Sequence, residues 1–256
     1  MLACDVNSFG GSLVRATRRI GLLGLAGLLL LTVAPASTTA ATKPYKLDLG
    51  SRSDYVAQTN LVQCVGASMQ MMLNMIEPGV DRSAKTQLKL QKLARKWSPP
   101  RLDGGVRKGA SVVGWAMGLS LEGAGPYKVV GADSLDEAML VAARSMRRTG
   151  RPVGLLVWRG RHAWVMSGFQ ATGDPLLAGT RVTAALVEDP LHPYGGSDTW
   201  GPSPSPGEAI SLTELGRQFV RRRSGFSIWS TPNLGGKYVL VVPYELDFRV
   251  LRHEAI

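Results

Sequence analysis

The strongest constraint on the fold is a change in sequence texture at Pro152. Before it, apolar residues recur at three- and four-residue spacings in segments that end at Pro or Gly, as in amphipathic helices. After it come short β-branched and aromatic runs, "VGLLVW", "HAWVMSGF", "TRVTAALVE" and "KYVLVVP", bounded by Gly, Pro and Asp. Helices followed by strands favour an α+β domain, with an N-terminal helical half packed against a C-terminal antiparallel sheet.

The helices expected before Pro152 cover residues 60–76, 83–97, 110–121 and 134–148. The last of them begins with a capping box formed by Ser134 and Glu137. The third is rich in Gly and Ala, which suits close packing between helices.

Two further segments follow the first strands. A short helix is expected over residues 211–220, with Ser211 as its cap and Glu214 three residues later. Residues 194–207, "YGGSDTWGPSPSPG", have the composition of a surface loop.

Residues 1–40 have the order of charges, apolar run and small residues that is typical of a secretory signal peptide. Arg15, Arg18 and Arg19 precede the run. The apolar part, residues 20–33, has 14 residues, fewer than the roughly 20 that span a bilayer. We therefore expect cleavage near Ala36 or Ala40, a secreted or cell-envelope protein, and no stable membrane span after cleavage.

The mature chain is expected to have an extended lead-in over residues 41–54 and one domain over residues 55–256, a length that suits a single core. Without residues 1–41 it carries 27 basic and 18 acidic residues, a net charge of +9. This charge favours an anionic cell-envelope polymer as a partner. Nucleic acid is the weaker interpretation, because the basic residues are scattered and no nucleic-acid-binding motif is recognisable.

Signal cleavage would remove Cys4 and leave Cys64 as the only cysteine of an exported chain. A lone cysteine in an oxidising compartment is either reactive or buried and inert. Cys64 is expected in the first turn of the first helix, where the helix dipole favours the nucleophilic thiolate. The alternative is a small apolar core residue. One cysteine and three scattered histidines form no metal-ligand cluster of recognised spacing, and no metal or other cofactor is predicted.

A thiol nucleophile requires a base, and the chain offers His162, His192 and His253. His253 is three residues from the C-terminus, and His192 follows "DPL" in a loop. His162 opens a strand directly after a turn, where a side chain can reach a cleft and still be held by the sheet. The alternative for His162 is a packing role.

An acidic partner for His162 emerges from the spacing of two strands. If residues 162–171 and 181–189 form a hairpin with its loop centred between residues 175 and 176, His162 lies opposite Asp189. The Asp189 carboxylate would then orient the imidazole. A register change of one residue would move Asp189 to the other face of the sheet. The alternative is that Asp189 only begins the turn before Pro190.

The last requirement of acyl transfer is a donor for the oxyanion of the tetrahedral intermediate. Gln58, six residues before Cys64, is far enough away in sequence to fold back beside the sulfur. The backbone N–H of Cys64 would be the second donor. Gln63, next to the cysteine, is the competing glutamine.

These residues together resemble the papain-like cysteine peptidase superfamily, and within it the bacteriocin-processing (double-glycine leader) peptidases and their exported relatives. The resemblance is carried by Gln58, by "CVGAS" opening a long helix, by "HAWVMSGF" and by "VEDP", in the order Gln, Cys, His, Asp. It covers residues 55–200. It implies a papain-like fold, a Cys64 thiolate nucleophile, His162 as base, Asp189 as orienting carboxylate and Gln58 as oxyanion donor. The loop between the two strands is longer than in that branch, and no transporter segments follow.

Three functions are therefore open. The first is an exported cysteine peptidase that cleaves peptide amide bonds through a thioester at Cys64. The second is an acyltransferase, similar to a transglutaminase, that passes the same thioester to an amine. The third is a module without catalysis that binds an anionic envelope polymer through its basic surface, and it predicts association that weakens with salt.

Overall fold

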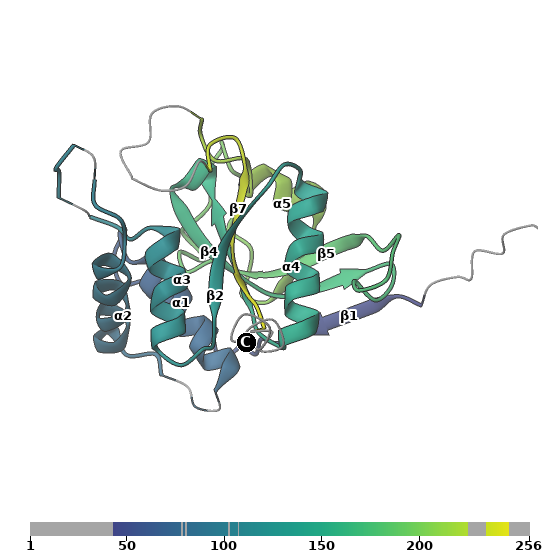
Figure 1. Ribbon diagram of the computed structural model, residues 1–256, viewed down its shortest axis with the longest axis horizontal. Helices are drawn as coiled ribbons and strands as arrows, with labels where there is room; N and C mark the ends of the chain where they lie inside the picture. Colours follow the sequence, from purple (N-terminus) through teal and green to yellow (C-terminus); the bar gives the residue numbers. More distant parts are fainter. Residues whose placement is uncertain are drawn as a thin grey trace, which may run out of the picture. The chain divides into compact units, whose positions relative to one another are not determined.

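The computed structural model describes residues 43–77, 79, 81–101, 103–106, 108–224 and 234–245. The predicted signal peptide, Cys4 and His253 lie outside these residues. The described elements, drawn in Figure 1, are β1 (Tyr45–Asp48), α1 (Cys64–Ile76), α2 (Ala84–Lys96), α3 (Val112–Leu121), β2 (Tyr127–Ala132), α4 (Leu135–Thr149), β3 (Val153–Val157), a 3-10 turn (Trp158–Gly160), β4 (His162–Ala171), β5 (Val182–Glu188), β6 (Glu208–Ser211), α5 (Leu212–Gln218) and β7 (Tyr238–Pro243). Helices and one antiparallel sheet confirm the α+β class.

The strands form a single sheet in the order β2-β7-β3-β4-β5-β6, and every described pairing is antiparallel. The strand β4 is its centre, since it pairs with β5 along one edge and with both β3 and β1 along the other. The prediction that residues 41–54 form a lead-in outside the domain is wrong in this respect. Tyr45 and Leu47 alternate toward the core, and the Tyr45 ring stacks on Phe169 of β4 at 5.8 Å.

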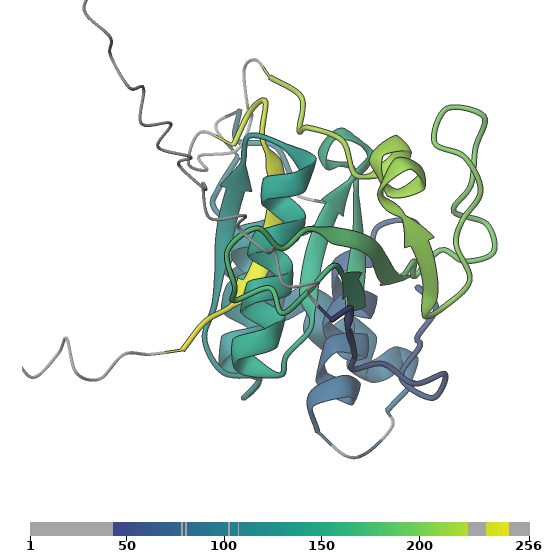
Figure 2. The same cartoon turned by 90° about the vertical axis from the view of Figure 1, so that its right-hand side faces the viewer.

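The sheet is covered by helices on both faces. Ala163 and Val165 of β4 pack with α1 and α3, whereas Trp164 and Met166 face the core under α4. In Figure 1 the helices α1, α2 and α3 lie on one side of the strands and α4 on the other; Figure 2 looks onto the α4 side. The predicted helical half is thus divided, because α4 returns across the sheet to the opposite face.

The three helices of the first face approach one another closely where glycine removes a side chain. A Cβ added at Gly114 of α3 would lie 1.9 Å from the carbonyl oxygen of Ala94 in α2. A Cβ added at Gly66 of α1 would lie 2.7 Å from the carbonyl oxygen of Gln87. The expectation of close helix packing is confirmed at these positions.

The helix starts lie within two residues of the prediction except at α1, which begins at Cys64 and not at residue 60. The Asn60 side chain accepts the Val62 N–H at 3.1 Å, a local turn that competes with helix formation. The Ser134 hydroxyl caps α4 as expected, but the Glu137 carboxylate accepts the N–H of Asp133 and not that of Ser134. The full capping box is present at Ser211 and Glu214 of α5.

Besides β1, two strands were not expected from the sequence. The strand β2 pairs with β7 at one edge of the sheet, and β6 pairs with β5 at the other. Both are edge strands. β6 has only four residues, and in β2 the apolar residues Val129 and Val130 are adjacent and do not alternate with polar ones, so neither carries a clear strand pattern.

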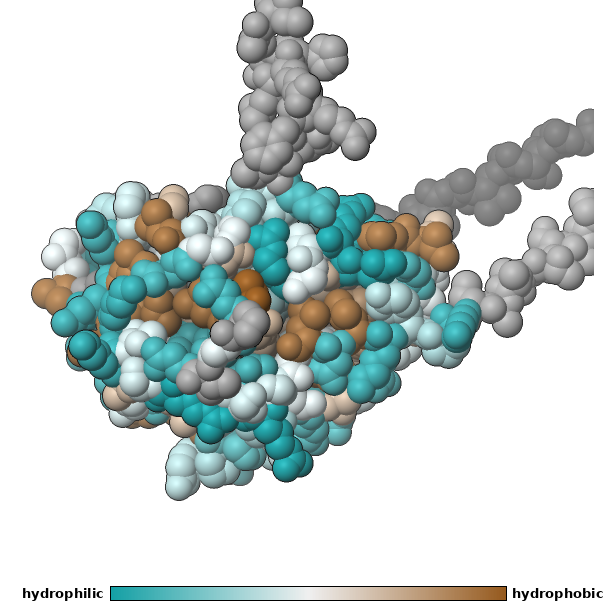
Figure 3. Space-filling model, turned by 90° about the horizontal axis from the view of Figure 1, so that it is seen from below, coloured by the Kyte–Doolittle hydropathy of each residue, from teal (hydrophilic) through white to brown (hydrophobic). Residues whose placement is uncertain are grey.

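The described helices are all too short or too polar to cross a membrane. On the face shown in Figure 3, hydrophobic residues form separate groups divided by hydrophilic side chains.

Candidate active site

Cys64 lies in the first turn of α1, as predicted, and is its first residue; its side chain is half-buried. The residue before it, Gln63, provides no side-chain cap for the helix. A glutamine of α2 takes this role: the Gln91 Oε1 accepts the Gly66 N–H at 2.8 Å, and its Nε2 donates to the Val62 carbonyl at 2.9 Å. The start of α1 is therefore held by its neighbour in space.

A second glutamine of α2, one turn earlier, holds the segment before the cysteine. The Gln87 Oε1 accepts the Thr59 N–H at 2.8 Å and the Thr59 hydroxyl at 3.0 Å, and its Nε2 donates to the Ala57 carbonyl at 3.0 Å. Both glutamines are buried. The sequence signal that could have found them is two amides four residues apart on the apolar face of α2.

The predicted pairing of His162 with Asp189 is wrong in register. Near the start of β4, Val165 pairs with Glu188 and Met166 with Val187, so Asp189 falls opposite Trp164, two residues from the prediction. The hairpin loop is centred one residue later than expected, and within it the Asp174 Oδ1 accepts the Leu176 N–H. A shift by two keeps His162 and Asp189 on the same face, on a diagonal that long side chains bridge.

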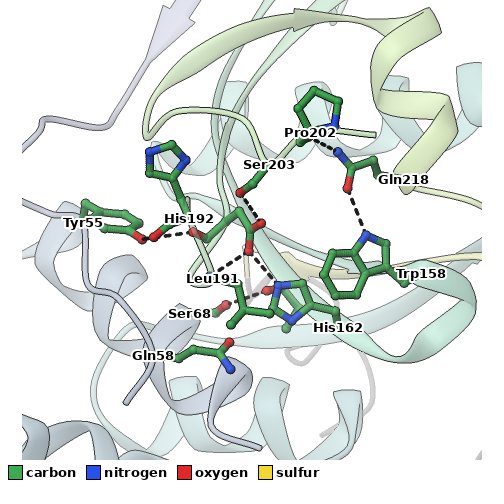
Figure 4. A network of polar contacts seen from close by, with 12 residues as sticks. Tyr55, Gln58, Ser68, Trp158, His162, Leu191, His192, Pro202, Ser203 and Gln218 are labelled. Carbon is green, nitrogen blue, oxygen red and sulfur yellow. Dashed lines mark hydrogen bonds and ion pairs between the residues drawn. The ribbon is translucent and has the colours of Figure 1, made fainter. Parts of the chain in front are cut away.

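The predicted contact is nevertheless present: the His162 Nε2 and the Asp189 Oδ1 are 2.7 Å apart, with both side chains buried (Figure 4). Two other donors serve the same carboxylate. The Ser203 hydroxyl donates to Oδ2 at 2.6 Å, and the Leu191 N–H donates to Oδ1 at 2.8 Å. Burial alone raises the pKa of Asp189, but these donors and His162 lower it below its usual value.

Gly195 leaves room for the Asp189 carboxylate because it lacks a side chain. A Cβ at this position would lie 2.0 Å from the Asp189 Oδ2, so no other residue fits without displacing the carboxylate. Ser203 and Gly195 lie in the segment identified from sequence as a surface loop, and no pattern there indicated contact with Asp189.

His162 lies between the acid and the thiol. Burial alone lowers its pKa, but the hydrogen bond with Asp189 and the proximity of the Cys64 side chain raise the pKa to about 9. Since Nε2 is bound to Asp189, Nδ1 is the ring nitrogen left for the sulfur. The structure thus brings together three of the four predicted site residues.

An aromatic ring fixes the plane of the imidazole. Trp158 stacks on His162 with ring centroids 4.4 Å apart, and its Nε1 donates to the Gln218 Oε1 at 2.9 Å (Figure 4). Trp158 and Arg159 both adopt positive φ angles, 54° and 57°, in the turn before His162. Non-glycine residues rarely adopt this conformation, and it concentrates at functional sites.

The segments before Cys64 and after Asp189 are joined directly. The Tyr55 hydroxyl donates to the carbonyls of Asp189 and His192, at 3.2 and 3.0 Å, and the Gln58 N–H donates to the Pro190 carbonyl at 2.8 Å. These bonds tie the segment before α1 to the loop after Asp189.

The fourth predicted residue, Gln58, lies in this junction. Its Nε2 donates to the Asn60 carbonyl at 2.7 Å, and its Oε1 is buried with no hydrogen-bond partner among the described residues. The competing Gln63 is directed elsewhere, because its Oε1 accepts the Thr59 hydroxyl at 2.6 Å. The histidine that was the alternative base, His192, has its ring turned away from His162 in Figure 4.

A cleft of about 270 Å³ opens beside the sulfur, and the residues lining it include Cys64, Leu61, Val62, Leu156, Arg161 and Arg222. Across the described ranges, His, Cys, Asp and Glu side chains form no group of three or more that could hold a metal ion. No family model, curated protein or solved structure matches this chain. Its function must therefore be inferred from the arrangement of its own residues.

Proposed function

We propose that this protein is an exported cysteine peptidase with a papain-like fold, similar to the bacteriocin-processing peptidases, that hydrolyses peptide amide bonds. The observation that carries the proposal is the position of His162, which is hydrogen-bonded to Asp189 and lies near enough to Cys64, the first residue of α1, for the thiol to raise the pKa of the imidazole. A nucleophile, a base and a group that orients the base are the three components of covalent acyl transfer.

The proposed reaction begins with transfer of the thiol proton from Cys64 to the Nδ1 of His162. The sulfur attacks the substrate carbonyl carbon, and the carbonyl oxygen becomes an oxyanion. Collapse of this intermediate breaks the C–N bond, while His162 donates its proton to the leaving amine. Water, deprotonated by His162, then attacks the thioester and releases the acid and the free thiol.

Two donors are proposed for the oxyanion. The Cys64 N–H, at the first position of α1, has no acceptor within the helix. The Gln58 Nε2 carries two hydrogens, and the bond to Asn60 uses one of them. Replacing Gln58 by Ala is expected to lower kcat by about 100-fold, as expected for the loss of one oxyanion donor.

The proposal is tested by alkylation of the mature protein with iodoacetamide at pH 6, followed by intact mass, and by cleavage of a quenched fluorescent peptide pool. Cys64→Ala should abolish cleavage. His162→Ala should slow alkylation at least tenfold, because the free thiol is mostly protonated at this pH. His192→Ala is the matched control, since its ring does not face the site, and should behave like the wild type.

Two results would contradict the proposal. One is full peptidase activity in Cys64→Ala. The other is equal alkylation rates in the two histidine variants. The mass of the products separates hydrolysis from acyl transfer, because transfer adds the acceptor amine in place of water.

A further inference from the structure

The cleft beside Cys64 is small and has two kinds of lining. Its volume of about 270 Å³ is close to the lower end of the roughly 300–1,000 Å³ typical of ligand pockets. Leu61 and Val62, both exposed, contribute an apolar part just before α1. The cleft therefore accommodates a short part of a polypeptide, next to the bond that Cys64 would attack.

The other part of the lining is cationic. Arg161 and Arg222 both line the cleft, and no described residue of its lining is Asp or Glu. Arg161 directly precedes His162 in the chain, so its position is fixed by the start of β4.

Arg222 reaches the same place from the segment before β7. Its N–H donates to the Lys237 carbonyl at 2.7 Å, and its own carbonyl accepts the Gly236 N–H at 2.9 Å. A Cβ added at Gly160 would lie 3.2 Å from the Arg222 Cγ, so the arginine stem packs over the turn that carries Arg161. Its partial burial leaves the guanidinium less hydrated than a surface arginine and lowers its pKa.

We propose that the cleft selects peptides that carry a carboxylate within a few residues of the scissile bond, bound by Arg161 in the cationic wall that it forms with Arg222. This inference rests on the proposed peptidase function and names its substrate class. Guanidinium groups bind carboxylates through paired hydrogen bonds and stay charged at any pH the protein tolerates. The carboxylate can belong to an Asp or Glu side chain or to the C-terminus of a short peptide.

The test uses quenched fluorescent peptides that are identical except for Glu, Gln or Lys at one position, scanned over three residues on each side of the cleaved bond. Each peptide is made with a free and with an amidated C-terminus, which separates the two sources of the carboxylate. We expect kcat/KM to be about tenfold higher for the preferred carboxylate than for its neutral match, and the preference to shrink as salt rises.

The decisive variant is Arg161→Glu, with Arg159→Glu as the matched control. Arg159 belongs to the same turn and changes the net charge equally, but it does not line the cleft. Arg161→Glu should abolish the preference for carboxylate and favour Lys, whereas Arg159→Glu should retain the wild-type ranking.

Binding is measured in parallel on Cys64→Ala by fluorescence anisotropy of the same labelled peptides, so that the inference is tested even without turnover. Equal kcat/KM for Glu, Gln and Lys peptides that are cleaved through Cys64 overturns the inference and leaves the peptidase intact. Cleavage of none of the peptides, with carboxylate binding that depends on Arg161, overturns the peptidase and retains the binding site. Equal effects of Arg159→Glu and Arg161→Glu also overturn it, since net charge then explains the preference.

Discussion

Asp189 and its chain neighbour Glu188 are both buried carboxylates, yet they have opposite chemical environments. Asp189 accepts hydrogen bonds from His162, Ser203 and Leu191, and its pKa is lowered. The Glu188 Oε2 has no hydrogen-bond partner among the described residues. Burial, together with the charges of Asp54 and Asp48, raises the pKa of Glu188 to about 8.

The difference follows from the alternation of side chains along a strand. Val187 and Met166, which pair across β4 and β5, lie in the core under α4, and Asp189 shares their face. Glu188 pairs with Val165 on the other face, where Asp48 and Asp54 approach. Two adjacent carboxylates therefore separate into an ionised partner for His162 and a group that remains protonated at neutral pH.

The largest effect is expected from Asp189→Asn. An amide cannot stabilise the imidazolium, and it can hold the ring in the wrong tautomer, so kcat/KM for peptide cleavage should fall by roughly 10³ or more. The pKa of His162 should also fall, because Asp189 is a main cause of its increase. Peptide hydrolysis measured from pH 5 to 10 would show both changes.

Glu188→Gln is the comparison for that experiment, because it changes the adjacent carboxyl group in the same way. It should leave kcat/KM within about threefold of the wild type, since Glu188 lies on the opposite face of the sheet from His162. Similar losses of activity in the two variants would contradict the distinction between the neighbours.

The second prediction concerns stability and the same Glu188→Gln variant. A carboxyl whose folded pKa is about 8 against an ordinary 4.5 keeps a proton that the unfolded chain releases. The free energy of unfolding should therefore fall as pH rises from 4.5 to 8, by on the order of 3 to 5 kcal/mol, through this group alone.

Urea unfolding at pH 5 and pH 8.5 measures this effect. The difference between wild type and Glu188→Gln isolates Glu188, because the contribution of His162 is common to both proteins. The variant should gain stability relative to the wild type as pH rises. A constant difference between the two pH values would show that Glu188 is ionised throughout.

The sequence predicted the residues of the site more accurately than the residues that hold them in place. Cys64 and His162 could be found because each begins an element with a strong periodic pattern. Asp189 was found through a register that is wrong by two residues, and the error was harmless because side chains alternate with a period of two. Asp174 lies in a Gly-Asp-Pro segment that predicts a turn, but this signal does not fix which residues of the flanking strands pair.

The supporting residues come from parts of the chain that are distant in sequence. Gln91 reaches α1 across 25 residues, and Ser203 reaches Asp189 across 14. Hydrogen bonds of this kind depend on how two elements pack, which no local pattern contains. The division of the helices between the two faces of the sheet was not predicted for the same reason. The face that α4 covers depends on the path of the chain and not on the helical pattern of its residues.

The third prediction is a smaller effect from Ser203→Ala. Loss of the hydroxyl leaves the Asp189 Oδ2 without that donor, which should cost about 1 to 2 kcal/mol of stability. Because Ser203 lowers the pKa of Asp189, the acid limb of the activity profile should move to higher pH. Ser205→Ala, at an exposed position nearby, is the matched control. An unchanged acid limb would show that Ser203 has a structural role alone.

The smallest effect is expected from Tyr55→Phe, which tests the link between the segment before Cys64 and the loop after Asp189. Burial, Asp189 and Glu188 together raise the pKa of Tyr55 to about 12, yet its hydroxyl donates to the carbonyls of Asp189 and His192, not to either side chain. Removing it should cost about 1 kcal/mol in urea unfolding, and kcat/KM should stay within about twofold of the wild type.

The pH dependence of stability is a more sensitive test of this variant than its activity. A tyrosine whose folded pKa lies above its ordinary value of 10 retains its proton in the folded chain, so stability should fall as pH rises from 10 toward 12. That part of the decline should disappear in Tyr55→Phe. Loss of activity comparable with Ser203→Ala would instead mean that the hydroxyl positions Asp189 for His162, and that the backbone of this loop, not only its carboxylate, controls the site.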